Sequence, residues 1–360
     1  MSLVIFLIIL AALIWVHELG HFSVAKLFGI RVEEFSIGFP PRIFRIRRGG
    51  TLYSLGVLLV GGYVKIFGEN HGEGRGDPSS LNSRSRWVQA AVLAAGVAFN
   101  VIFAWALLSA GYMAGLPTPK DHAGFGEVKN ANVTVVGVLP GSPAERAGFA
   151  PGDILQGIET GTAKFAGGNA EDARAFIAGR AEESMVVAVL RGEEEKTFLA
   201  RPENGIIEGR KALGVELGDY GILQLPPHLA LAQGAILAER ITVESVRGLG
   251  DFLGKILRGA ADFSGVAGPV GIAGAGAQAV QGGFSTTIVI TALISINLAI
   301  INLLPIPGLD GGRLLIIAIE GIFRRAIPER LVTSLTLVGF ALLIALMVAV
   351  TTHDIARLVG

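Results

Sequence analysis

Residues 3–28 of the chain read LVIFLIILAALIWVHELGHFSVAKLF, an apolar segment long enough to cross a membrane as one helix. His17, Glu18 and His21 interrupt this segment in the pattern H-E-x-x-H. Two histidines four residues apart lie on one face of a helix, so both imidazoles can reach one ion, and the glutamate can take a proton from water on that ion. Ionisable side chains at membrane depth are costly and therefore point to function. The pattern predicts a zinc hydrolase site rather than two core histidines and a glutamate facing a polar cavity.

The composition is typical of a membrane protein. Hydrophobic residues make up 51% of the 360 residues and charged residues 17%, with a mean hydropathy of +0.58. The formal net charge is zero, which gives no reason to expect a nucleic-acid partner. The chain has no cysteine, so a bound metal must use nitrogen and oxygen ligands. The first segment lacks a basic n-region and a small-residue cleavage site, so we expect it to stay as a span rather than to be removed as a signal peptide.

Three further segments are apolar enough to span a membrane, namely residues 87–116, 284–309 and 331–351. Between the first two spans, residues 29–86 hold nine Lys or Arg residues. The positive-inside rule therefore predicts that this loop is cytoplasmic and that both termini lie outside. Asn100 is the one strongly polar side chain near the middle of the second span, and we interpret it as a helix-to-helix hydrogen bond.

Three regions outside the predicted spans have sequence patterns that differ from those of transmembrane helices. Residues 51–67 form a short apolar run with Gly61-Gly62 in the middle, which predicts a β-hairpin that dips into the membrane; an amphipathic surface loop is the alternative. Residues 130–218 show strand-like alternation and frequent turns, as in a small mixed domain. Residues 219–283 include a stretch with helical spacing that we expect to lie on the membrane surface.

The third predicted span runs into NLLPIPGLDGG, residues 302–312. Two prolines and three glycines around one acid cannot form a regular helix, and a broken helix at membrane depth must line a cavity or be buried in protein. A catalytic zinc site takes three protein ligands and keeps one position open for water. Asp310 lies near the same predicted cytoplasmic boundary as the two histidines and can be the third ligand. Peptide hydrolysis with Glu18 as general base is then the expected reaction.

The motifs together resemble a known family. Residues 135–158 resemble a PDZ domain of the bacterial, circularly permuted kind, which offers a strand edge to an extended peptide. HELGH in the first span, this PDZ-like insert and NLLPIPGLDGG are similar to the site-2 protease family of intramembrane zinc metalloproteases, over essentially the whole chain. The branch that it resembles most is the bacterial one that cleaves anti-sigma factors and signal-peptide remnants.

The resemblance implies roles for particular residues. The zinc ligands would be His17, His21 and Asp310, and the general base would be Glu18. Asn302 and Pro307 match positions that help to hold substrate, and residues 52–66 match a membrane-dipping β-hairpin. Within that hairpin we expect Leu58 and Val60 to offer edge backbone groups to an unwound substrate, in the manner of β-strand addition.

The expected protein is an α-helical polytopic membrane protein with four transmembrane helices, a membrane-dipping β-hairpin and an inserted extracytoplasmic α+β PDZ domain. The first two spans are predicted at residues 1–116 and the PDZ-like domain at residues 130–218. A membrane-surface amphipathic region is predicted at residues 219–283 and the last two spans at residues 284–360. We expect it in the cytoplasmic membrane of a bacterium, with the active site near the cytoplasmic side. Its expected partners are the lipid bilayer, single-span membrane proteins as substrates, and peptide or protein C-termini at the PDZ-like domain.

The chain departs from the family pattern in two places, and two other classes of protein remain as alternatives. It has one PDZ-like domain where several relatives have two, and it reads Gly96-Val97 where Gly-Pro is usual. A non-catalytic membrane-anchored PDZ adaptor would keep this fold but would have little use for Glu18 beside two ligands. A transporter with broken helices would predict inverted repeats between the two halves of the chain, and the sequence shows none.

Overall fold

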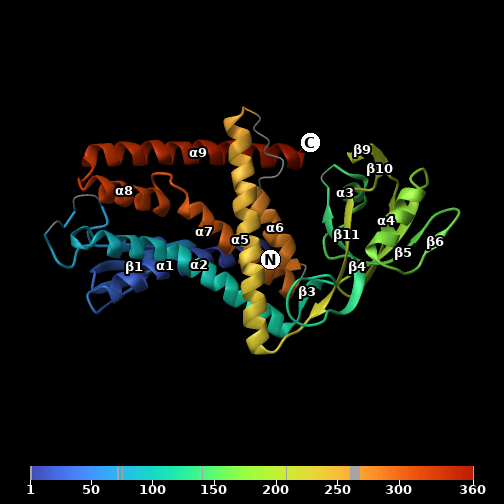
Figure 1. Cartoon of the computed structure of the whole chain (residues 1–360), viewed down its shortest axis with the longest axis horizontal. Helices are drawn as coiled ribbons and strands as arrows, with labels where there is room; N and C mark the ends of the chain where they lie inside the picture. The colour runs from blue at the N-terminus through green and yellow to red at the C-terminus, as the bar shows by residue number, and fades with distance from the viewer. Residues whose placement is uncertain are drawn as a thin grey trace. The chain divides into compact units, whose positions relative to one another are not determined.

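The computed structural model describes residues 2–70, 73–74, 76–139, 141–207, 209–259, 268–281 and 283–359. The chain divides into two compact units. Met1–Leu108 and Gly234–Gly360 form the first unit, and Ser109–Gln233 forms the second. Figure 1 traces the elements from α1, in blue, to α9, in red.

Four helices among the described residues are long and apolar enough to cross a membrane. They are α1 (Ser2–Leu27), α2 (Arg86–Ala114), α7 (Phe284–Leu303) and α9 (Glu329–Val359). Their mean hydropathy reaches 2.1 to 2.5. A helix pairs its own backbone N–H and C=O groups, so such segments can enter hydrocarbon without unpaired polar groups. The four segments predicted as spans are therefore helices of the required length and composition.

Small residues allow α1 and α2 to pack closely. A Cβ atom added at Gly20 of α1 would lie 2.4 Å from the carbonyl oxygen of Ala95 in α2. Close backbone contact of this kind favours helix association in a membrane, where burying apolar surface against protein gains little. α7 joins α2 through an apolar cluster that includes Ala104, Ala292 and Ile296. The first and third predicted spans therefore both pack against α2, α1 at Ala95 and α7 at Ala104.

The apolar run that follows the first span pairs with the residues that precede it. β1 (Val32–Arg48) and β2 (Thr51–Ile66) are antiparallel, and each strand bends back on itself. The first half of β1 therefore has a partner on both sides: Phe35 pairs with Tyr53 in the first half of β2 and with Val64 in the second half. The second half of β2 therefore has no second partner strand among the described residues, and β2 packs against α1. The prediction that residues 51–67 pair with each other as a hairpin is wrong, because both halves of this segment pair with β1, which begins at Val32.

Proline ends the third span earlier than we expected. α7 stops at Leu303, before Pro305 and Pro307, whereas the sequence suggested a span up to residue 309. Helix α8 (Asp310–Phe323) begins directly after the break. Helix α8 was not predicted from the sequence.

The region predicted to lie on the membrane surface contains two helices, α5 (Pro227–Leu257) and α6 (Pro269–Gln281). α6 begins at a buried carboxylate of α9. Asp354 accepts hydrogen bonds from the backbone amides of Gly268 at 3.3 Å and Gly271 at 2.8 Å. The first amides of a helix have no intrahelical carbonyl to bind, so this side chain satisfies them and ties α6 to α9.

The second unit is a sheet with two short helices. Its elements are β3 (Leu116–Pro119), β4 (Lys129–Val138), α3 (Pro143–Ala147), β5 (Ile154–Glu159), β6 (Lys164–Phe165), α4 (Ala170–Gly179), β7 (Met185–Arg191), β8 (Glu194–Ala200), β9 (Glu203–Ile207), β10 (Arg210–Ala212) and β11 (Val215–Leu223). The main sheet has the order β3-β11-β4-β5-β7-β8, with β6 paired to β5, while β9 and β10 pair separately. Residues 130–218, which the sequence assigned to the PDZ-like domain, lie inside this unit.

One ion pair of the second unit joins a buried carboxylate to a half-buried guanidinium. The carboxylate of Asp153 is fully buried and accepts hydrogen bonds from Nε of Arg191 at 2.6 Å and Nη2 at 2.8 Å. These hydrogen bonds raise the pKa of the Arg191 guanidinium above its usual range. Removing the guanidinium would leave a buried, unpaired charge, so the pair fixes how β5 and β7 meet.

Candidate active site

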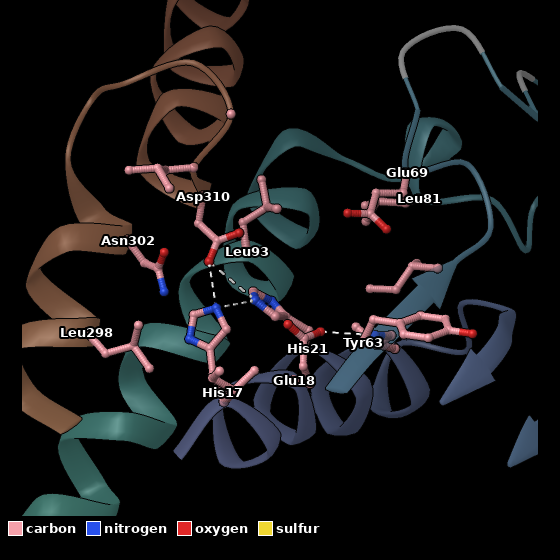
Figure 2. Close-up of a pocket in the computed structure, with 15 residues that line it drawn as sticks. His17, Glu18, His21, Tyr63, Glu69, Leu81, Leu93, Leu298, Asn302 and Asp310 are labelled. Atoms are coloured by element: carbon pink, nitrogen blue, oxygen red, sulfur yellow. Dashed lines mark hydrogen bonds and ion pairs between the residues drawn. The ribbon is translucent and has the colours of Figure 1, made fainter. Parts of the chain in front are cut away.

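Three metal-ligand atoms converge in the first unit. Nε2 of His17 and Nε2 of His21, both on α1, lie 3.1 Å and 3.3 Å from Oδ2 of Asp310, the first residue of α8. The two Nε2 atoms are 3.1 Å apart. Figure 2 shows the carboxylate facing both imidazoles from the opposite side of the site. The structure thus brings together the three residues that the sequence analysis named as ligands.

The size of this triangle fits zinc. Two ligand atoms of a tetrahedral zinc ion, each about 2.1 Å from the metal, lie about 3.4 Å apart. Oδ2 of Asp310 is buried and receives no hydrogen bond. A buried charged oxygen without a donor costs about 1–3 kcal/mol or more, and a cation bound among the three atoms would offset that cost. Two imidazole nitrogens and one carboxylate oxygen are also a donor set that Zn²⁺ commonly takes in catalytic sites.

A hydrogen bond from the ring of His21 to α2 sets the orientation of this candidate ligand. Nδ1 of His21 lies 2.8 Å from the carbonyl oxygen of Val92. A carbonyl only accepts, so Nδ1 carries the proton and Nε2 keeps its lone pair for a metal. The ring lies close to α2, since a Cβ atom added at Gly96 would be 2.4 Å from Nε2 of His21. The site therefore leaves no room for a side chain at position 96. The Gly96-Val97 pair, which stands where Gly-Pro is usual, keeps the glycine that this packing requires.

The break between α7 and α8 places Asp310. Pro305 and Pro307 cannot continue the backbone hydrogen bonds of α7, so the chain leaves the helix there. The chain then turns back so tightly that a Cβ atom at Gly311 would lie 2.1 Å from the carbonyl oxygen of Leu303, and one at Gly312 would lie 2.2 Å from that of Ile306. The two glycines after the aspartate are thus required by close backbone approach.

Glu18 lies in the wall of a cavity of about 320 Å³ that also holds the three ligands. Its carboxylate accepts a hydrogen bond from the backbone amide of Val64, in the second half of β2, at 3.0 Å. This amide fixes the position of the carboxylate next to His17 and His21. Tyr63 of β2 lines the same cavity, and Figure 2 shows it beside Glu18. The arrangement places a carboxylate close to the three ligand atoms, as a general base for hydrolysis requires.

The structure separates the residues expected to hold substrate. Asn302, in the last turn of α7, lines the cavity, whereas Pro307 is not among the lining residues. Pro307 instead packs against α9, where a Cβ atom at Gly339 would lie 2.0 Å from the Pro307 carbonyl oxygen. Leu58 lies where β2 bends, opposite Phe39, and does not line the cavity.

The backbone of Val60 belongs to β2, while its side chain lies outside the described part of the structure. The residues of β2 that do line the cavity are Tyr63, Val64 and Ile66. Both Leu58 and Val60 remain predictions as substrate-binding residues.

Two further contacts of the site were missed by sequence reasoning. Arg313, in the first turn of α8, bonds to Glu69, with Nη1 2.5 Å from Oε1, and Glu69 lines the cavity. This ion pair ties the helix that carries Asp310 to the segment that follows β2. Asn100 makes the helix-to-helix hydrogen bond interpreted from the sequence, from α2 to α1, but its partner was missed: the side-chain amide lies 3.4 Å from Nδ1 of His17. No local pattern reveals either contact, because the paired residues are far apart in sequence.

Two histidines and a glutamate on a helix of transmembrane composition, with an aspartate of α8 facing the histidines, are the arrangement expected of a membrane-embedded zinc hydrolase. The chain belongs to peptidase family M50, the family of site-2 proteases, whose profile matches residues 5–346. It is therefore an intramembrane metalloprotease of the site-2 type, and zinc is its metal.

Proteins from several bacteria are similar to the chain over nearly its full length. A protein of Clostridium perfringens is 34% identical, and the match covers 99% of this chain and 98% of the relative's length. A protein of Nostoc is 32% identical, and the match covers 99% of this chain and 97% of the relative's length. A Synechocystis protein is 33% identical over 97% of this chain and 93% of its own. All three carry the name "Putative zinc metalloprotease".

Proposed function

We propose that the protein cleaves the transmembrane segments of single-span membrane proteins in a bacterial cytoplasmic membrane. Such cleavage would serve regulated intramembrane proteolysis, with anti-sigma factors or signal-peptide remnants as the substrate classes. The observation that carries the proposal is the triangle of His17, His21 and Asp310 in the wall of a cavity that also holds Glu18. Two of the ligands and the base lie on a helix of transmembrane composition.

Each residue of the site has a separate task. His17, His21 and Asp310 would hold Zn²⁺, which when bound acts as a Lewis acid and makes water a good nucleophile near neutral pH. Glu18 accepts a proton from the attacking water and passes it to the leaving amine. The amide of Val64 holds the Glu18 carboxylate in place for both transfers.

The distribution of charge supports an orientation with the site near the cytoplasm. The nine Lys and Arg residues between the first two spans would hold residues 29–86 inside. The termini and the second unit would then lie outside, where the PDZ-like domain would sort substrates or bind their C-termini. A long loop is translocated with little regard to its charge, so this domain does not oppose the orientation.

A helical substrate has to be unwound before water can attack it, because each peptide bond is shielded by its own helical turn. Every backbone group freed in hydrocarbon costs several kcal/mol unless it is paired again. The free edge of β2 and the Asn302 amide in the cavity are suited to supply such partners. Leu58→Pro, Val60→Pro or Asn302→Ala should then reduce cleavage of stable helices more than cleavage of substrates with Gly or Pro near the scissile bond. Equal losses on both kinds of substrate would contradict a role in holding the unwound chain.

Co-expression with candidate single-span membrane proteins tests the proposed function. We expect shortened products with the wild-type protein and none with Glu18→Gln, which should still bind about one zinc ion. His17→Ala should lose both products and zinc. Products that persist in Glu18→Gln would remove Glu18 as the base. A wild-type protein that binds partners through the PDZ-like domain but yields no product would favour the non-catalytic adaptor.

A further inference from the structure

Asn100 is a fully buried polar residue of α2 whose side chain meets a metal ligand. Its Nδ2 atom lies 3.4 Å from Nδ1 of His17, and its exposed fraction is 0%. Its Oδ1 atom is buried and has no hydrogen-bond partner. A buried, unpaired amide oxygen costs about 1–3 kcal/mol, so its presence beside the metal site calls for an explanation.

The hydrogen-bonding requirement of His17 as a metal ligand explains why Asn100 lies there. Its Nε2 atom faces Asp310 and His21, so this is the nitrogen that would bind the metal and must keep a lone pair. A neutral imidazole then carries its proton on Nδ1, and that N–H needs an acceptor. His21 has such an acceptor in the carbonyl oxygen of Val92. For His17 the neighbour that the structure gives to Nδ1 is the carboxamide of Asn100.

The two orientations of that carboxamide have opposite consequences. If the NH₂ group donates to Nδ1, the proton of His17 lies on Nε2, and this nitrogen cannot bind a metal. If Oδ1 faces Nδ1 instead, it accepts the Nδ1 proton, Nε2 is free and the unpaired oxygen gains a donor. The oxygen and nitrogen of a carboxamide have nearly the same shape, so a half-turn of the amide exchanges them in the same space. Only the second orientation is compatible with zinc on Nε2.

We propose that Asn100 is a positioning residue for His17: its Oδ1 accepts the Nδ1 proton and thereby aims the Nε2 lone pair at the metal. Partners of this kind fix the tautomer and ring orientation of histidine ligands and raise their affinity for the metal. The site then holds its two histidines in different ways, since His21 uses a backbone carbonyl of α2 and His17 uses a side chain of the same helix.

A purely structural role for Asn100 can be separated from this one. The bond between α2 and α7 at this position runs from Oγ of Ser295 to the backbone oxygen of Asn100, at 2.8 Å. The contact between α2 and α7 therefore does not use the Asn100 side chain. Ser295→Ala removes that contact and leaves the carboxamide in place, which makes it a matched control.

The test measures zinc affinity of the purified full-length protein by competition with a chelator. Asn100→Leu, which has the same branched arrangement of heavy atoms and no acceptor, should bind zinc about 10–100-fold more weakly. Asn100→Asp, which keeps an acceptor oxygen, should bind within a few-fold of wild type, and Ser295→Ala should be unchanged. Wild-type affinity in Asn100→Leu would overturn the proposal, as would an equal loss in Ser295→Ala or a failure of folded Asn100→Asp to retain zinc.

A second measurement needs no variant at position 100. Nitrogen NMR of ¹⁵N-histidine-labelled zinc-bound protein, assigned by comparison with His17→Gln, should show Nδ1 of His17 protonated. An unprotonated Nδ1 would overturn the proposal. The proposal rests on zinc binding at His17, which wild-type protein tests separately. Wild-type protein that binds no zinc would count against the site as a whole, whereas normal zinc binding with an unprotonated Nδ1 would count against Asn100 alone.

Discussion

A methyl group added at Gly96 would enter the space that two of the proposed zinc ligands, His17 and His21, occupy. A Cβ atom at this position lies 2.4 Å from Nε2 of His21 and 2.7 Å from Cε1 of His17. Non-bonded heavy atoms prefer a separation of about 3.5 Å, so the His21 ring would have to retreat by about 1 Å. Metal–ligand distances hold to within about 0.2 Å. We therefore expect Gly96→Ala to impair zinc binding while α1 and α2 remain folded.

Two effects of opposite sign decide the size of the change. Replacing glycine by alanine inside a helix stabilises the helix by about 1 kcal/mol. Loss of a hydrogen bond that merely orients a metal ligand weakens binding by about 10–100-fold, and displacing the ligand itself should do at least as much. We expect zinc binding about 100-fold weaker or more, equivalent to about 2.8 kcal/mol, with little loss in stability of the metal-free protein.

The assay is zinc content and chelator competition on purified protein, with circular dichroism to confirm that the helices remain. Gly274→Ala in α6 is the control, because no atom lies within 4 Å of a Cβ atom there. Gly274→Ala should bind zinc as the wild type does. Normal zinc affinity in Gly96→Ala would refute the close packing of α2 on the histidines. An equal loss in both variants would show a general effect of replacing helical glycines.

Three other predictions concern sidedness, the second unit and α6. In intact cells of this cysteine-free protein, Ser184→Cys should react with a membrane-impermeant thiol reagent and Ser85→Cys should not; the opposite pattern would invert the topology. Arg191→Ala should destabilise the second unit by about 3 kcal/mol, because it leaves a buried carboxylate without its cation. Lys164→Ala, at an exposed ion pair, should cost at most about 1 kcal/mol in the same thermal unfolding measurement, and equal losses would contradict the reasoning. Asp354→Ala should remove a helix cap worth about 1 kcal/mol and speed hydrogen exchange at the start of α6 about five-fold; unchanged exchange would show that this cap is not needed.

Features set by local periodicity could be predicted from the sequence. The i, i+4 spacing of His17 and His21 places both imidazoles on one helix face whatever the rest of the chain does. Long uncharged segments become helices in a membrane because no other isolated segment pairs its own backbone groups there. Asp310 could be named because an acid between prolines and glycines at a helix break has few structural roles.

Features that depend on contacts distant in sequence needed the tertiary structure. The strand pairing of residues 51–66 lay with residues 32–48, which alternation within one run could not reveal. Asn302 and Pro307 belong to one motif, yet only Asn302 reaches the cavity, because the break after α7 turns Pro307 towards α9. Asn100 makes the helix-to-helix hydrogen bond that the sequence suggested, but only packing shows that its partner is Nδ1 of His17. The sequence determined which residues could serve zinc chemistry. Only packing between segments decided which of them meet, because hydrogen bonds and metal ligation require atoms within about 3 Å of one another, wherever they lie in the chain.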